Sequence, residues 1–206
     1  MGNATLLDII GSMLVSGILL LAALRMNEQA SVNTFESQAN LTVQQNLTSI
    51  INNIEWDFRK TGYCGDPNAQ PKNFMYIVHG DTSDITFVGD LDDNGTLDTI
   101  RWYQGATPIP GTANPRVRML YRTVNGASPF EANLGVTQFY LRYFDTNGDT
   151  VSTPFDAPST VKLIEVTVRV EATRLNALLT NTSPGALTTP DCRPAAIYIR
   201  YNAKAT

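Results

Sequence analysis

Residues 6–29 read LLDIIGSMLVSGILLLAALRMNEQ, and this apolar run decides the fold. No charged residue occurs between Ile9 and Leu24, and Asp8 lies just before them. Counted from Ala4, the apolar stretch is about 21 residues long, close to the roughly 20 that cross a bilayer core as a helix. Three interpretations stand: a cleaved secretory signal, a plain membrane anchor, and a helix that moves from the membrane into a filament. The first is disfavoured, because no basic residue precedes the run and LAALRMNEQA is a poor cleavage site.

The sequence after this run continues as a helix. No Gly or Pro occurs from Ile18 to Thr61, and apolar residues recur there at spacings of three and four, as on one face of a helix. These apolar residues are Val32, Phe35, Ala39, Val43, Leu47, Ile50, Ile54 and Phe58. Gly62 suits the position after a helix end. We therefore predict one helix from about Leu6 to about Thr61.

The rest of the chain has the pattern of short strands separated by turns. Seven segments are predicted as strands: 74–79, 84–89, 97–104, 116–124, 135–145, 161–173 and 195–202. In the sixth, Ile164, Val166, Val168 and Val170 alternate with polar residues, as expected of a sheet with one face on the core. The predicted fold class is α+β, with an antiparallel sheet packed on the amphipathic part of the helix. Its parts are residues 1–25, the apolar half of the helix; 26–61, the amphipathic half; and 62–206, a β-rich head.

The opening residues resemble the mature form of a type IV pilin or pseudopilin. Such chains begin with an apolar residue, Thr, Leu, and Leu or Ile, then an acid, and Thr5, Leu6, Leu7 and Asp8 follow that order. The sequence departs from the pattern in having Asp where Glu is usual and in the three or four residues before the motif. The resemblance covers the first 60 residues best. It implies that Asp8 meets the N-terminal amine of a neighbouring subunit and sets the axial register; an acid favoured by the helix dipole is the alternative.

The resemblance also implies a function and a location. The leading hypothesis is a structural subunit of an extracellular type IV pilus-like filament, a homo-oligomer held together by its apolar helices. The subunit would be anchored in the inner membrane before assembly and handled by a separate pilus assembly machinery. One alternative is a minor pilin or pseudopilin that primes or caps a filament. Another is a membrane-anchored, calcium-dependent adhesion or carbohydrate-binding module.

A second motif, GDLDDNGTLDTI, follows the second predicted strand. Asp90, Asp92, Asn94, Thr96 and Asp98 fit the first nine positions of a calcium loop, with Gly at the sixth. The twelfth position is Arg101, so the motif is not an EF-hand. Calcium is the predicted cofactor, because four carboxylates in nine residues repel one another without a cation. An Asn-Gly hairpin turn with solvated acids is the alternative.

A similar stretch, FDTNGDT at residues 144–150, places its Gly too early for such a loop. We interpret this stretch as a hairpin turn.

Composition narrows the remaining choices. The net charge is −4 and the sequence pI about 4.9, which argues against nucleic acid as a partner. Cys64 and Cys192 are the only cysteines; a disulfide between them is favoured, with two buried free thiols as the alternative. The single histidine, His79, is expected to be an ordinary strand residue. Neither a Ser-His-Asp set nor a P-loop nor a Rossmann glycine pattern can be assembled, so no enzyme is predicted.

Overall fold

A computed structural model describes residues 2–66, 76–112, 114–132, 134–156, 160–172 and 195–202, with backbone alone for 2–7 and 195–202. The chain divides into two compact units, Met1–Leu41 and Thr42–Thr206. This division falls inside the N-terminal helix.

The helix α1 runs from Gly2 to Arg59, which confirms the prediction of one long helix. It ends two residues before the predicted position. The chain then tightens, because the Thr61 N–H donates to the Phe58 carbonyl at 3.1 Å. Gly62 has φ +68°, a conformation that glycine adopts without a steric cost, and its N–H donates to the Val88 carbonyl at 2.8 Å. The residues just after the helix end are therefore hydrogen-bonded to Val88, near the end of strand β2 (Asp84–Gly89).

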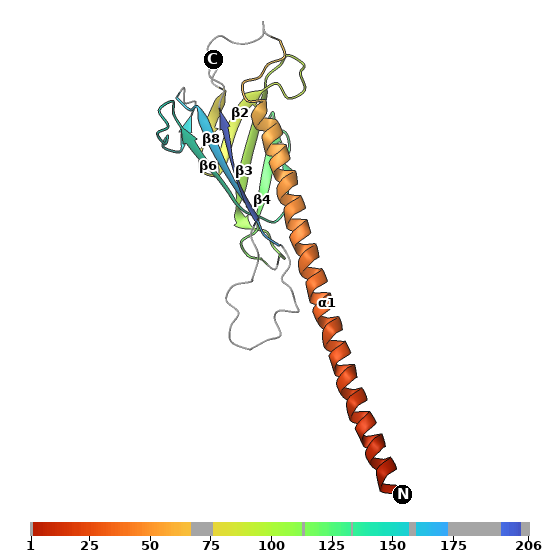
Figure 1. The fold of residues 1–206 in the computed structure, drawn as a ribbon. Helices are drawn as coiled ribbons and strands as arrows, with labels where there is room; N and C mark the ends of the chain where they lie inside the picture. The colour runs from red at the N-terminus through yellow and green to blue at the C-terminus, as the bar shows by residue number, and fades with distance from the viewer. Residues whose placement is uncertain are drawn as a thin grey trace. The chain divides into compact units, whose positions relative to one another are not determined.

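Residues 42–59 of α1 lie beside the strands of the second unit (Figure 1). The predicted apolar face is buried in this part of the helix, at Val43, Leu47, Ile50, Ile54 and Phe58, and Ile51 is buried with it. The earlier members of the same stripe, Val32, Phe35 and Ala39, are half-buried or exposed. The stripe therefore contributes to the core only from Val43 onward.

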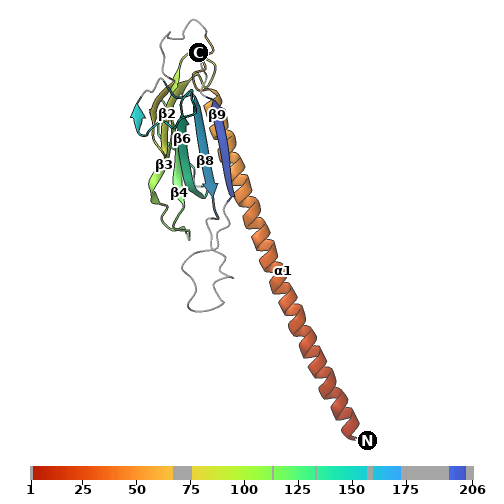
Figure 2. The same cartoon turned by 60° about the vertical axis from the view of Figure 1, so that its left-hand side comes forward.

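Within the described residues, nine strands form two antiparallel sheets. The first sheet has the order β5-β4-β3-β2-β1-β7, and the second has the order β6-β8-β9 (Figure 2). Their bounds are β1 Ile77–Gly80, β2 Asp84–Gly89, β3 Asp98–Pro108, β4 Arg118–Val124, β5 Phe130–Ala132, β6 Val136–Phe144, β7 Phe155–Asp156, β8 Leu163–Val170 and β9 Ala195–Asn202.

The α+β class is confirmed, but the prediction of a single sheet is wrong. An alternating pattern identifies a strand and its buried face, yet it does not say which strands pair. Two strands were also missed, β5 and β7. They are three and two residues long, too short for a period of two to show.

One hydrophobic core joins the helix residues from Val43 onward to both sheets. The Phe58 ring meets Phe87 of β2 edge to face, with 5.1 Å between ring centroids. On β3, Ile100 and Trp102 point inward while Thr99 and Arg101 are exposed, which is the alternation of a strand with one face on the core. Burying one such large apolar side chain stabilises the fold by about 1.5–3 kcal/mol.

Strand β8 differs from its prediction on one face. Ile164, Val166 and Val168 are buried as expected, but Glu165 and Thr167 on the opposite face are buried too. Glu165 accepts a hydrogen bond from Nη1 of Arg142 on β6 at 3.4 Å. In the sequence, an acid at this position is typical of a residue that faces solvent. The alternating pattern therefore could not reveal that Glu165 is buried and paired with Arg142 of a neighbouring strand.

Candidate functional site

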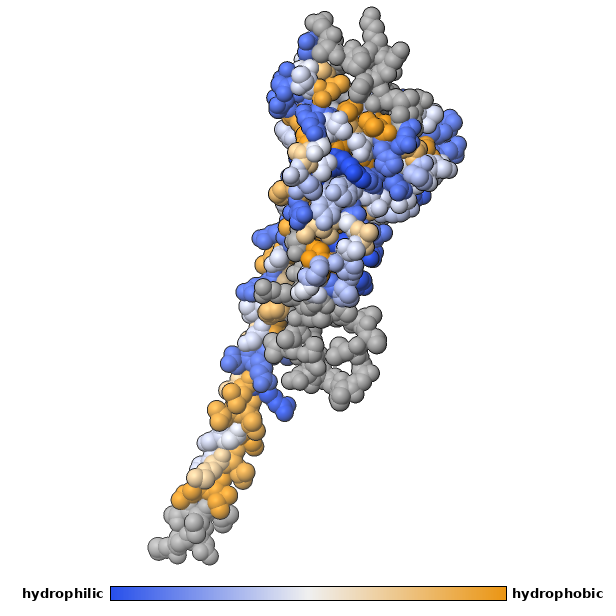
Figure 3. All heavy atoms as spheres, turned by 180° about the vertical axis from the view of Figure 1, so that it is seen from behind, coloured by the Kyte–Doolittle hydropathy of each residue, from blue (hydrophilic) through white to orange (hydrophobic). Residues whose placement is uncertain are grey.

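The first unit presents a continuous apolar surface. The large apolar side chains from Ile9 to Leu24 are each 52–70% exposed, and Figure 3 shows them along the N-terminal part of α1. The helix contains one stretch long and apolar enough to cross a membrane, by length and composition. Such a surface is stable only when lipid or other protein covers it.

A polar side chain, Ser12, and a gap in the side-chain cover at Gly17 interrupt this apolar surface. The Ser12 hydroxyl donates to the Ile9 carbonyl at 2.9 Å, so this polar group is satisfied within the helix. Around Gly17, the side chains of Met13, Leu14, Ile18 and Leu21 border a shallow, open hollow in the helix surface. A Cβ added at Gly17 would meet nothing within 4 Å. The hollow can therefore receive a side chain of another helix.

Of the predicted N-terminal motif, Asp8 is an exposed residue of α1. The side chains of Thr5, Leu6 and Leu7 lie outside those described.

The predicted calcium loop connects β2 to β3. The structure brings together Asp90, Asp92 and Asp98, one carboxylate oxygen from each lying within 4.8 Å of the others. Asp90 is fully buried, Asp98 is half-buried and Asp92 is exposed. Three converging carboxylates fit a hard cation that takes oxygen ligands.

Asp90 is held by backbone donors. Its Oδ2 accepts the N–H groups of Gly65 and Gly95, each at 2.9 Å, and its Oδ1 accepts that of Asn94 at 3.1 Å. Burial is the largest single influence on the Asp90 pKa and raises it, but the backbone hydrogen bonds together outweigh burial, so the pKa is lowered. Asp90 is therefore a carboxylate at neutral pH.

The other two predicted ligands are engaged with each other. The Asn94 Oδ1 accepts the Thr96 N–H at 2.7 Å and also the Thr96 hydroxyl. The Asn94 amide in turn donates to Asp92 Oδ2 at 2.8 Å. Asp98 accepts the Leu91 N–H at 3.1 Å. The acidic side chains that converge on one point are thus those of Asp90, Asp92 and Asp98, and the Asn94 side chain and the Thr96 backbone carbonyl stay predicted ligands.

The second acidic stretch is a hairpin turn, as predicted. The Gly148 N–H donates to the Asp145 carbonyl at 3.2 Å, and Asp145 Oδ1 accepts the N–H groups of Asn147 and Asp149 at 2.8 and 2.9 Å. His79 lies on β1, as expected, with its Nδ1 2.6 Å from Asp156 Oδ1.

Cys64 is a buried free thiol in the structure, and its Sγ donates to the Asp66 and Gly95 carbonyls at 3.4 and 3.6 Å. Its predicted partner, Cys192, lies outside the described residues. The disulfide stays a prediction.

Sequence reasoning missed a charged cluster in the second unit. Asp57 of α1 is 1% exposed and accepts hydrogen bonds from Trp102 and Arg122. The available signal was an acid directly beside Phe58 on the apolar side of the helix. The partners, 45 and 65 residues away, leave no local pattern.

No protein-family model, curated protein or solved structure matches the chain.

Proposed function

We propose that this protein is the structural subunit of an extracellular, type IV pilus-like filament, anchored in a membrane before assembly. The observation that supports this most is the apolar surface from Ile9 to Leu24, which needs a cover of lipid or of like helices. In the filament, copies of α1 pack side by side and the β-rich units lie outside them. Asp8 pairs with the N-terminal amine of a neighbouring copy, because an unpaired charge among apolar helices is costly.

Gly17 distinguishes a filament helix from a plain anchor. Lipid tails adapt to any apolar shape, whereas helices that pack closely need small residues at the contact. We expect Gly17→Leu to leave the amount of protein in the membrane fraction unchanged and to reduce filaments. Gly17→Ala is the matched control and should assemble, since the hollow can hold one methyl group.

The direct test is electron microscopy of material sheared from cells that produce the protein, with mass spectrometry of its N-terminus. We expect filaments in which this chain is the main component. Asp8→Ala should reduce their number, and Asp8→Glu should restore it. If the chain is recovered only as a dispersed membrane monomer, the proposal is wrong; if it is scarce in sheared filaments, the minor-subunit alternative replaces it.

We also propose that the turn between β2 and β3 binds calcium through Asp90, Asp92 and Asp98. The convergence of three carboxylates supports this, because their mutual repulsion is relieved by a divalent cation. When bound, the ion supplies positive charge that fixes the turn.

Isothermal titration with Ca²⁺ after EGTA treatment tests the calcium proposal. We expect saturable binding, and a melting temperature that rises with Ca²⁺ concentration because the ion binds the folded state. Binding should be lost in Asp92→Asn/Asp98→Asn. The matched control is Asp145→Asn in the other acidic turn, which should bind as the native chain does. Absence of heat and of any melting shift would contradict the site.

A further inference from the structure

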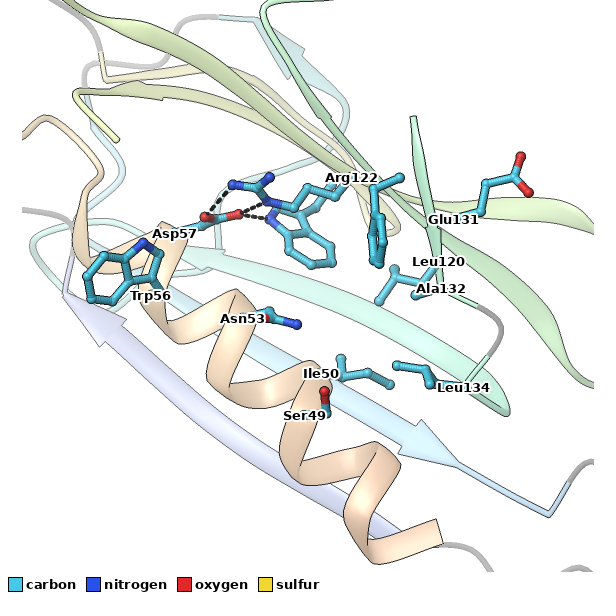
Figure 4. A pocket seen from close by; sticks show the side chains of 12 residues that line it. Ser49, Ile50, Asn53, Trp56, Asp57, Leu120, Arg122, Glu131, Ala132 and Leu134 are labelled. Carbon is cyan, nitrogen blue, oxygen red and sulfur yellow. Dashed lines mark hydrogen bonds and ion pairs between the residues drawn. The ribbon is translucent and has the colours of Figure 1, made fainter. Parts of the chain in front are cut away.

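A groove in the second unit lies between α1 and the strands β4 and β5 (Figure 4). Its volume is about 570 Å³, within the range of about 300–1,000 Å³ that small-molecule sites occupy. One wall is a single helix face, and the other is formed by the edge strand β5 with its neighbour β4. Among the residues that line it are Ser49, Asn53, Trp56, Asp57, Arg122 and Phe130.

Two aromatic rings on this groove are open to solvent. Trp56 on the helix wall is 61% exposed and Phe130 on the strand wall is 65% exposed. Lys60 Nζ lies 5.8 Å from the centroid of the Trp56 ring. Large rings are usually buried, so a pair on opposite walls of one groove is a candidate binding surface.

Half-buried Arg122 has unused hydrogen-bond donors. Its Nε and Nη2 donate to Asp57 at 2.6 and 2.8 Å. A guanidinium carries five N–H groups, and among the described residues Nη1 has no acceptor. The side chains of Asn53 and Ser49 are exposed on the helix wall and likewise have no hydrogen-bond partner in the described part of the chain. Figure 4 shows the Asn53 amide directed toward the space between the helix and the strands.

Two of the three charged residues that line the groove neutralise each other, and the third, Glu131, is exposed. Asp57 and Arg122 form an ion pair, and the Trp102 N–H also donates to Asp57 at 2.7 Å. Figure 4 shows the Glu131 carboxylate directed away from that pair. An anionic ligand such as a phosphate therefore gains no net attraction here, because Arg122, the cationic side chain of the described lining, is already paired with Asp57.

We propose that this groove binds a neutral saccharide. A sugar ring has an apolar face of C–H groups that stacks on an aromatic ring, and its hydroxyls both donate and accept hydrogen bonds. Trp56 and Phe130 supply the stacking surfaces. Arg122 Nη1 donates, and the Asn53 amide and Ser49 hydroxyl donate and accept. This inference goes beyond the filament proposal and does not depend on it.

Calorimetric titration of the full chain in detergent tests the proposal, with neutral trisaccharides of glucose, mannose, galactose and N-acetylglucosamine as probes. Both tryptophans of the chain line the groove, so their emission provides a second readout. We expect at least one trisaccharide to bind saturably, at concentrations up to about 10 mM.

Matched variants locate the binding. Trp56→Ala should raise the dissociation constant by about tenfold or more, which corresponds to about 1.4 kcal/mol, and Asn53→Ala should weaken binding as well. Tyr140→Ala removes an exposed ring on β6 outside the groove and should bind as the native chain does. Because Trp56 and Asn53 are exposed, both variants should fold, which circular dichroism checks. Absence of binding to every trisaccharide, or equal binding by the native chain and Trp56→Ala, overturns the proposal.

Discussion

Replacing Asp57 by Ala tests how much the hydrogen bonds between α1 and the first sheet contribute to the free energy of unfolding. The carboxylate is 1% exposed and accepts three hydrogen bonds: from Trp102 Nε1 at 2.7 Å, from Arg122 Nε at 2.6 Å and from Arg122 Nη2 at 2.8 Å. Truncation leaves a buried indole N–H and a guanidinium without their acceptor.

The cost has two parts. An unsatisfied buried N–H costs about 1–3 kcal/mol, and Trp102 is buried. Removing one partner of a fully buried ion pair costs about 3–5 kcal/mol, but Arg122 is 28% exposed and can take up water, so its share is smaller. We expect the free energy of unfolding to fall by about 3 kcal/mol, which lowers the melting temperature by about 6–12 °C for a unit of this size.

Urea unfolding of the full chain in detergent, followed by circular dichroism and tryptophan emission, measures this loss. Glu55→Ala is the matched control: Glu55 pairs with Arg59 one turn along the helix surface, and such exposed pairs contribute about 0.3–0.5 kcal/mol. The double variant Asp57→Ala/Arg122→Leu should lose about 2 kcal/mol less stability than the sum of the losses in the two single variants, because the two residues interact directly. A loss for Asp57→Ala no larger than for Glu55→Ala would refute the buried pair.

Three further predictions concern the second unit. Gly89→Ala places a Cβ 1.9 Å from the Lys60 carbonyl oxygen, so the helix end must move, and we expect a loss of more than about 2 kcal/mol in the same urea assay. Ile54→Ala should cost about 2–5 kcal/mol because the side chain is fully buried, whereas Leu41→Ala at an exposed position should cost little. Asp90 has a pKa below its ordinary 3.8, so its contribution is present above about pH 4 and is lost as pH falls through the lowered value. The urea midpoint should then fall less steeply with acidification in Asp90→Asn; an unchanged slope would mean that the buried carboxylate does not contribute.

The sequence predicted best the features that depend on neighbours along the chain. The helix period placed Val43, Ile50 and Phe58 on one buried face, and β2 was predicted at its observed bounds, because each pattern is local. The acidic turn was predicted for the same reason, since its three converging acids lie within nine positions. That Asp90 is buried could not be predicted, because its burial depends on Gly65 from a distant segment. The groove is formed by four separate elements, α1, β3, β4 and β5, so its residues have no characteristic spacing in the sequence.

The acidic turn is also part of the junction between the helix end and the first sheet. The Asp90 N–H donates to the Tyr63 carbonyl at 2.8 Å, Gly65 donates to the Asp90 carboxylate, and Lys60 Nζ lies 2.6 Å from Asp93 Oδ1. A cation bound between the acids would therefore stabilise this junction as well as the turn, by an amount set by its concentration relative to its dissociation constant. In a filament whose copies are joined through α1, a head stays in register only as long as this junction and the buried stripe hold it to the helix.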